Sequence, residues 1–293
     1  MLQVLLTGAT GFLGSKLVAR MASKPDAYKV TALKRTFSNT WRIAHLLESV
    51  QTEDIDLNDL SRVFEGRKFD VIIHCATDYG RKQTSRSDII ESNLVLPLRL
   101  LELGMRNNVS AFLNTDTMLD KRVSDYTLSK RQFREWLESV AADIKGINMI
   151  LEHFYGPGDD ATKFVTAIVR SLVRGQSEIA LTEGKQRRDF IFIDDVVDAF
   201  MRVLESIHTL PLGYSEYEVG SGRSVSIREM VETATRLAGN GATHLKFGAI
   251  PYRPNEPMDV SVNTDRLAAL GWFSKWSLAD GLKETICAER ELL

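Results

Sequence analysis

The chain has 293 residues, of which 44% are apolar and 26% charged, so its composition is that of an ordinary globular protein and not of a disordered, collagen-like or coiled-coil one. Lys and Arg together number 37 and Asp and Glu 39, and the resulting charge of −2 gives no overall attraction to nucleic acid or to anionic lipid. Cys75 and Cys287 match no metal-binding spacing, and no apolar run reaches the ~18 residues of a membrane span. We therefore expect a cytoplasmic protein without a bound metal and without a nucleic-acid or membrane partner.

Short apolar runs and longer helix-patterned stretches alternate along residues 1–150. This alternation predicts βαβ units and a parallel sheet, and the runs are continuously apolar, as expected where helices cover both faces. We expect strands at 4–7, 29–33, 71–74, 111–114 and 148–151, with a third strand before Asp54, and helices at 12–23, 38–48, 57–65, 87–106 and 125–142.

A glycine-rich loop, TGATGFLG at residues 7–14, follows the first strand directly and opens a helix. The first glycine, Gly8, permits a tight turn, Gly11 lets a pyrophosphate approach the backbone, and Gly14 allows the helix to pack closely on the strand, while N–H groups at the helix start hold the anion. The loop therefore predicts a dinucleotide site. The alternative reading is a tight strand-to-helix turn without a ligand.

The end of the second strand bears on the choice of dinucleotide. An acidic residue there would bind the ribose 2′-hydroxyl of NAD, but this strand ends in Lys34 and Arg35. Two cations can neutralise a 2′-phosphate, which favours NADP(H) over NAD(H), whereas the alternative is a solvated basic loop. Asp54 and Ile55, after the third strand, are expected to border the adenine.

A phenol and an ammonium share one helix face, because Tyr126 and Lys130 are four residues apart. Phe133 continues that stripe, whereas Arg134 is assigned to another face, so Lys130 is expected to point inward. A buried lysine is costly, and a cation beside a phenol lowers the phenol's pKa from about 10 toward the working pH. Thr115, at the end of the strand 111–114, can hydrogen-bond a substrate carbonyl; alternatively it is a polar strand end.

After Tyr155 the turn cluster 156–159 changes the pattern to short helices with scattered glycine and proline. We expect an α/β fold with a Rossmann-type, doubly wound parallel sheet in a cofactor-binding domain at 1–154. A smaller substrate-binding region follows at 155–293, of which about 188–208 packs back on the first domain.

These motifs together resemble the extended short-chain dehydrogenase/reductase family of nucleotide-sugar enzymes, whose glycines have the spacing of Gly8, Gly11 and Gly14. The resemblance extends over the whole chain. It also includes Tyr126 with Lys130, VIIHCA at 71–76, NLVLP at 93–97, YGPG at 155–158, RDFIFIDDV at 188–196 and LGW at 270–272. The segments 112–116 and 151–158 look most like those of 4-keto-6-deoxyhexose reductases.

The resemblance implies a catalytic triad of Thr115, Tyr126 and Lys130, a nucleotide-diphosphate-sugar substrate, and a homodimer formed through helices around 87–106 and 125–142. The cofactor contacts that it implies or that the residues suggest are Gly8, Thr10, Gly11, Phe12, Leu13, Gly14, Lys34, Arg35, Asp54, Ile55, Ala76, Thr77 and Asn93, besides Tyr126 and Lys130. The expected substrate contacts are Asp116, His153, Arg188 and Arg253, the two arginines on a diphosphate.

The chain departs from the family pattern where Thr117 replaces the second carboxyl of an acid/base pair, which argues against a dehydratase. The loop between Thr115 and Tyr126 is also short, and Ile150 and His153 replace an arginine and an asparagine. We expect an NADPH-dependent reductase of a CDP- or dTDP-linked 4-keto-6-deoxy sugar, serving deoxysugar or lipopolysaccharide biosynthesis. The alternatives are a 4-epimerase that retains its cofactor and a non-catalytic NADP-binding regulator.

Overall fold

The computed structural model describes residues 1–57, 59–81, 84–253 and 256–292. The chain divides into two compact units, the first made of Met1–Leu151 with Phe200–Tyr217 and the second of Glu152–Ala199 with Glu218–Leu293. The division falls after residue 151, where the sequence predicted a boundary after 154. Of the segment 188–208 that was expected to rejoin the first domain, residues 200–208 belong to the first unit and 188–199 to the second.

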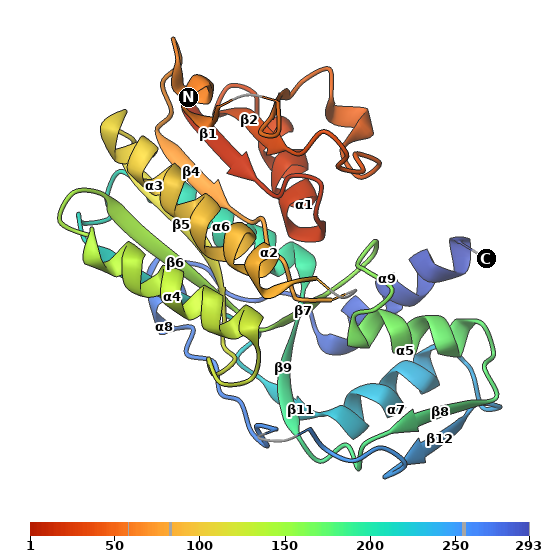
Figure 1. Ribbon diagram of the computed structural model, residues 1–293. Helices are drawn as coiled ribbons and strands as arrows, with labels where there is room; N and C mark the ends of the chain where they lie inside the picture. The colour runs from red at the N-terminus through yellow and green to blue at the C-terminus, as the bar shows by residue number, and fades with distance from the viewer. Residues whose placement is uncertain (58, 82–83, 254–255, 293) are drawn as a thin grey trace. The chain divides into compact units, whose positions relative to one another are not determined.

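The first unit contains a seven-stranded sheet in the order β10-β6-β5-β4-β1-β2-β3 (Figure 1). All pairings from β6 to β3 are parallel. This order places the crossover beside β1 and is that of a Rossmann dinucleotide-binding domain, which confirms the predicted fold class. The strands are β1 (Leu2–Thr7), β2 (Tyr28–Lys34), β3 (Gln51–Asp54), β4 (Val71–His74), β5 (Ala111–Thr117), β6 (Lys145–Leu151) and β10 (Tyr214–Val219).

Long helices cover this sheet. In Figure 1, α3 (Leu96–Arg106) and α4 (Asp125–Ser139) lie side by side across β4 and β5. The core beneath them contains Phe112 and Phe133, whose ring centroids are 5.5 Å apart. The helix expected at 87–106 is present as α2 (Arg86–Ile90), a π-helical turn at Glu91–Val95, and α3, while α1 spans Phe12–Ala22 and α6 Ile193–Glu205.

Two predicted helices were wrong. In place of helices at 38–48 and 57–65 the structure has short 3₁₀ turns at Ala44–Leu46 and Leu60–Phe64, and Asn58 lies outside the described residues. Within 38–48 only Ile43 is buried, so the segment has no apolar stripe that a helix could pack on the sheet. The second turn buries Val63 and Phe64 and ends before Gly66, which has a φ of +66°.

The second unit combines small sheets with three mutually packed helices, α5 (Phe164–Val173), α7 (Ile227–Leu237) and α9 (Leu278–Glu291). One sheet has the order β11-β9-β7 and the other pairs β12 with β8. The remaining elements are β7 (His153–Tyr155), β8 (Glu178–Leu181), β9 (Arg187–Phe192), β11 (Ser224–Ser226), β12 (His244–Phe247) and α8 (Asp265–Ala269).

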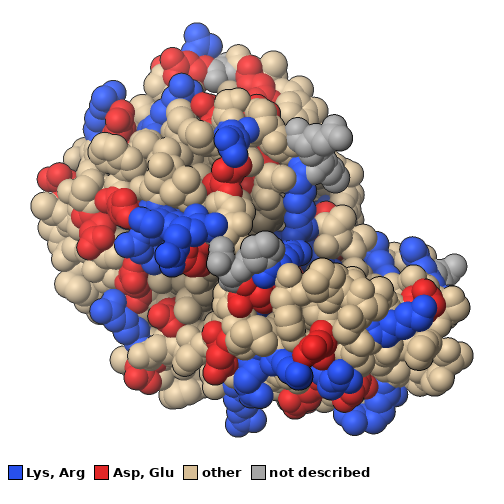
Figure 2. Space-filling model, turned by 60° about the horizontal axis from the view of Figure 1, so that its bottom comes forward, with Lys and Arg blue, Asp and Glu red and all other residues tan. Residues whose placement is uncertain are grey.

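Acidic and basic side chains are interspersed over the face of the molecule seen in Figure 2. Among the described residues, no helix is both long enough and apolar enough to cross a membrane. In the same part of the chain, no group of three or more His, Cys, Asp or Glu side chains is arranged to hold a metal ion.

Candidate functional site

The glycine loop between β1 and α1 is packed so tightly that side chains are excluded from it. Gly8 has a φ of +72°, and a Cβ added there would lie 2.5 Å from the backbone nitrogen of Ala76. A Cβ on Gly14 would lie 2.1 Å from the carbonyl oxygen of Gly8. The two glycines therefore let the loop pack closely on the start of α1 and on the segment after β4. Gly11 is exposed at the helix start, where a dinucleotide pyrophosphate would bind.

The other residues expected to contact the cofactor around this loop are partly exposed in some cases and buried in others. Thr10, Phe12, Ala76 and Thr77 are partly exposed. Leu13 is buried in the inward stripe of α1, so only its backbone is available to a ligand. Sequence position alone did not separate these two situations.

The end of β2 differs from the prediction in one respect. Lys34 forms an ion pair with Asp54 on the neighbouring strand β3, and the backbone N–H of Ile55 donates to the carbonyl of Lys34. The Lys34 cation and the Asp54 carboxylate therefore neutralise each other, and neither presents a lone charge to a cofactor. Arg35, directly after β2, is exposed, and its guanidinium lies 4.9 Å from the ring centroid of Phe37.

A second arginine near the loop was not predicted. Arg42 Nη1 donates a hydrogen bond of 3.3 Å to the carbonyl of Thr10 in the glycine loop, and its guanidinium stacks 4.5 Å from the ring centroid of Trp41. Since the segment was expected to be helical, no periodic signal placed this guanidinium beside the loop. The structure brings it there through the irregular course of residues 38–50.

The start of α4 is fixed by a reciprocal capping box. Ser124 Oγ accepts from the backbone N–H of Thr127, and Thr127 Oγ1 accepts from the backbone N–H of Ser124. Such a box satisfies two N–H groups and typically stabilises a helix start by about 1 kcal/mol. It sets the first turn of α4, which carries Tyr126.

The Tyr126 side chain is partly exposed, and its ring centroid lies 5.0 Å from that of Tyr79. Burial, with smaller contributions from Tyr79 and Asp116, raises the pKa of the Tyr126 phenol above its ordinary value. The sequence had suggested a lowered pKa, but in this protein burial and the two neighbours together outweigh the smaller lowering effects of Thr117 and Arg81. The phenol is therefore protonated at neutral pH, which is the form that donates a proton.

Lys130, one turn further along α4, points inward as predicted. It is 1% exposed, and within the described ranges its Nζ has no hydrogen-bond partner. Burial lowers the pKa of Lys130 to about 8, although the Asp116 carboxylate acts in the opposite direction. A buried ammonium without a partner is unfavourable unless a ligand supplies one.

The two threonines at the end of β5 differ in their contacts. The Thr115 hydroxyl, expected to hold a substrate oxygen, donates a 3.0 Å hydrogen bond to the carbonyl of His74. The Thr117 hydroxyl, in contrast, lies near the Tyr126 phenol, whose pKa it lowers, and it accepts from the backbone N–H of Leu119 at 3.2 Å. The hydroxyl beside the phenol is thus that of Thr117, which the sequence analysis had considered only as a missing carboxyl.

Asp116 and Asn93, both expected to touch ligands, have protein partners in the structure. Asp116 is 3% exposed, and its carboxylate accepts hydrogen bonds from Arg134, Asn148 and the backbone N–H of Thr117, while its contact with a substrate stays a prediction. Arg134 had been assigned to another helix face, and its position four residues after Lys130 was the missed signal.

Asn93 is fully buried in the π-helical turn. Its Oδ1 accepts from the backbone N–H of Asp78, and its Nδ2 donates to the Asp78 carbonyl and to Ser129 Oγ. The Asn93 amide thus connects the segment after β4 to the helices, and its contact near the nicotinamide stays a prediction.

Of the three substrate residues predicted in the second unit, Arg188 and His153 have protein partners. Arg188 is 4% exposed, pairs with Glu256 and donates to the carbonyl of Pro257 at 2.7 Å. His153 Nδ1 lies 3.0 Å from a carboxylate oxygen of Glu152. Arg253 is exposed and precedes two residues outside the described part, one of which is Pro254 of its predicted motif.

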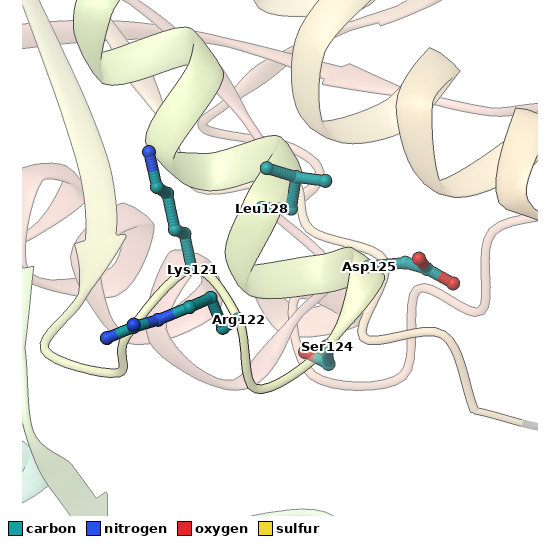
Figure 3. Close-up of a pocket in the computed structure, with 5 residues that line it drawn as sticks. All are labelled: Lys121, Arg122, Ser124, Asp125 and Leu128. Carbon is teal, nitrogen blue, oxygen red and sulfur yellow. The ribbon is translucent and has the colours of Figure 1, made fainter.

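An open hollow lies beside the first turn of α4, lined by Lys121, Arg122, Ser124, Asp125 and Leu128 (Figure 3). In Figure 3 the Lys121 and Arg122 side chains lie on one side of the helix start and Asp125 on the other. Arg122 is paired with Asp120 at 2.8 Å. Because its polar groups do not converge on a point, the hollow by itself does not define a ligand site.

Known proteins resemble the chain over nearly its whole length. Residues 4–220 match the model of the NAD dependent epimerase/dehydratase family. CDP-abequose synthases of Salmonella typhimurium and Salmonella muenchen are 35% and 32% identical, each alignment covering 97% of both chains. The structure of UDP-glucuronic acid 4-epimerase from Bacillus cereus in complex with UDP-glucuronic acid and NAD superposes with a TM-score of 0.84 at 21% identity, covering 99% of this chain and 100% of that one. The expected family is confirmed: the chain belongs to the NAD dependent epimerase/dehydratase family of enzymes.

Proposed function

We propose that the protein is an NADPH-dependent reductase of a nucleotide-linked 4-keto-6-deoxy sugar, CDP- or dTDP-activated, in deoxysugar and lipopolysaccharide biosynthesis. The relatives named CDP-abequose synthase support this substrate class, since they align with 97% of the chain. The proposal places the reaction at Tyr126 and Lys130 of the first unit.

The observation that carries the proposal is the Lys130 ammonium. It is buried and lacks a hydrogen-bond partner among the residues described, while it shares the inward face of α4 with a protonated phenol one turn away. An arrangement that costs stability is retained when a ligand needs the cation, and the hydroxyls of a nicotinamide ribose are suitable acceptors. The glycine cradle, in which a side chain would collide with Ala76, fits the same dinucleotide.

The proposed chemistry adds a hydride to the keto carbon and a proton to its oxygen. A bound reduced nicotinamide supplies the hydride. Tyr126 donates its phenolic proton to the developing alkoxide, and the Thr117 hydroxyl, whose oxygen already accepts from Leu119, donates to the resulting phenolate. We assign this hydroxyl role to Thr117 because the Thr115 hydroxyl donates to the His74 carbonyl.

We assign the cofactor as NADP(H) on the basis of two arginines. Arg35 follows β2, where the ribose 2′ group of a bound dinucleotide lies, and Arg42 reaches the glycine loop. Guanidinium groups bind phosphate oxygens in a bidentate manner, which suits a 2′-phosphate. Lys34 has no part in this assignment, since it is paired with Asp54.

The proposal also includes the other expected partners. Arg188 and Arg253 are proposed to hold the diphosphate, with Arg188 exchanging Glu256 for the ligand, and His153 to contact the sugar. A homodimer is proposed through the helices around 87–106 and 125–142, where Ile90, Leu128 and Trp136 are exposed large apolar residues. The proposed location is the cytoplasm.

The reaction is tested by incubating the protein with NADPH and a panel of CDP-, dTDP- and GDP-linked 4-keto-6-deoxy sugars while following cofactor absorbance. We expect the wild type to consume NADPH with a CDP- or dTDP-linked member. Tyr126→Phe should lower kcat by roughly 10²- to 10⁴-fold, because the proton donor is lost, while the Kd for NADPH stays within a few-fold. Sugar inversion without net NADPH consumption would instead identify a 4-epimerase, and cofactor binding without turnover of any sugar a regulator.

Lys130→Met should abolish activity and yet stabilise the cofactor-free protein at pH 7. The folded pKa of Lys130 is about 8, below the unfolded value of about 10.4, so below pH 8 the wild type carries a penalty on the order of 3 kcal/mol, which is relieved as the pH rises toward 10.4. The stability advantage of the variant should therefore shrink between these two pH values. Urea unfolding across pH 7 to 10.5 measures it, with the exposed Lys68→Met as control; a destabilised Lys130→Met at pH 7 would contradict the assignment.

The two threonines of β5 provide a matched pair of substitutions. Thr117→Val should lower kcat by roughly tenfold or more, since the phenolate loses its donor. Thr115→Val should keep most of the activity and lose about 1 kcal/mol of stability with its hydrogen bond to His74. Steady-state kinetics and thermal unfolding of both variants decide; the reverse ranking of the kcat values would restore Thr115 to the proposed role.

The cofactor assignment predicts that the wild type binds NADPH more tightly than NADH. Arg42→Met and Arg35→Met should each weaken NADPH binding by roughly tenfold and leave NADH binding little changed, because only NADPH carries the 2′-phosphate. Lys34→Met is the matched control and should leave the ratio nearly unchanged, since Lys34 pairs with Asp54. Calorimetric titration at fixed salt gives the Kd values, and equal affinity of the wild type for both cofactors would refute the assignment.

A further inference from the structure

Three residues at successive helical turns of α4 face the end of β5. Tyr126, Lys130 and Arg134 are spaced by four residues and therefore lie on one stripe of the helix. The first two belong to the proposed reaction. The Arg134 side chain is only 15% exposed, although nothing in the proposed chemistry uses it.

Arg134 reaches across to β5 with two different donors. Its Nε donates to Asp116 Oδ2 at 2.5 Å, and its Nη2 donates to the carbonyl of Thr117 at 3.3 Å. Its Nη1 lies 3.6 Å from Glu216 at the sheet edge. The guanidinium thus contacts the same residue, Thr117, whose hydroxyl meets the Tyr126 phenol.

The Asp116 carboxylate accepts three hydrogen bonds from protein groups. Besides Arg134 it accepts from Asn148 Nδ2 at 2.8 Å and from the backbone N–H of Thr117 at 2.7 Å, and Asn148 in turn accepts from Asn114 at 2.7 Å. The Asp116 side chain is 1% exposed. A buried carboxylate held by three donors on two strands and one helix is a fixed anchor.

We propose that Asp116 and Arg134 form a positioning pair that fixes α4 on the carboxyl end of β5 and places one anion and one cation beside the Lys130 ammonium. This role rests on the proposed function, since it deepens the account of the same site. Neither residue touches the reacting atoms; both act through Tyr126, Thr117 and Lys130.

An ion pair at this place fixes the register of α4 on β5 more precisely than apolar packing would. A buried ion pair adds little net stability over apolar groups of the same size, but a guanidinium that must meet a carboxylate and a carbonyl together accepts one register of helix on strand. A shift of about 1 Å in that register is enough to lower a rate by roughly 10²-fold.

The charges of the pair act on Lys130 with opposite signs. The groups that face its ammonium are His74 and Cys75 at the end of β4, Asp116 on β5 and Arg134 on its own helix. Asp116 favours the protonated ammonium and Arg134 disfavours it. Removing either member should therefore shift the Lys130 titration, in opposite directions.

The kinetic test compares Arg134→Met, Arg134→Lys and Asp116→Asn in the full-length protein. Arg134→Met should lower kcat by roughly 10²-fold with the NADPH Kd within about threefold, and Arg134→Lys, which keeps the charge but not the fork, should recover part of the loss. The control is Arg131→Met on the same helix, an arginine whose partner Glu135 is exposed, and it should leave kcat unchanged. Wild-type kcat in Arg134→Met, or no recovery by Arg134→Lys, would overturn the proposal.

The second test needs no activity, so it separates failure of the pair from failure of the proposed reaction. Each background is combined with Lys130→Met, and the unfolding free energy of background and derivative is compared across pH 6 to 11. The pH at which the difference between them begins to shrink should move down in Asp116→Asn and up in Arg134→Met. Shifts in the same direction, or none in either background, would contradict the proposal; a wild type that reduces no sugar but shows the opposite shifts would refute only the reaction.

Discussion

The structure depends on one costly arrangement, a lysine ammonium held in the protein interior one helical turn from a phenol. Lys130 lies among residues of the sheet core, close to the buried His74 and without a hydrogen-bond partner in the described portion of the chain. Two features of α4 hold Lys130 in this position. The capping box fixes the start of the helix, and the buried Phe133 packs the following turn into the core. Removing an ammonium from water in this way lowers the stability of the folded protein. It also favours the binding of a ligand that supplies hydrogen-bond acceptors to the ammonium.

A second layer of polar groups runs through the sheet behind this lysine. Asn114, Asn148, Asp116 and Arg134 are joined in a chain of hydrogen bonds. Buried polar networks specify geometry because each donor accepts few alternative partners. The end of β5 is thereby fixed at the point where its two threonines diverge, one toward the backbone of β4 and one toward the phenol.

The sequence predicted those features that depend on local spacing. The glycine loop, the inward Lys130 and the parallel sheet around β1 follow from residues within one βαβ unit or one helix, and the structure has them. The sequence-based predictions were wrong where a charged side chain pairs with a residue distant in sequence. Lys34 is neutralised by Asp54, twenty positions away on the neighbouring strand, and Arg134 by Asp116, eighteen positions away. Lys34 and Asp116 were taken as available to a ligand, but strand pairing gives Lys34 a partner and the packing of α4 on β5 gives Asp116 one.

The Asn93 amide has a consequence for how tightly a ligand can be held. It binds both the N–H and the carbonyl of Asp78, so the segment that continues from β4 past Ala76 is tied to the π-helical turn at two points. A strand end that is immobilised before any ligand arrives loses little conformational freedom when one does. The entropy cost of ordering this segment is thus met during folding, so it does not reduce the affinity for a ligand that binds at this edge of the sheet.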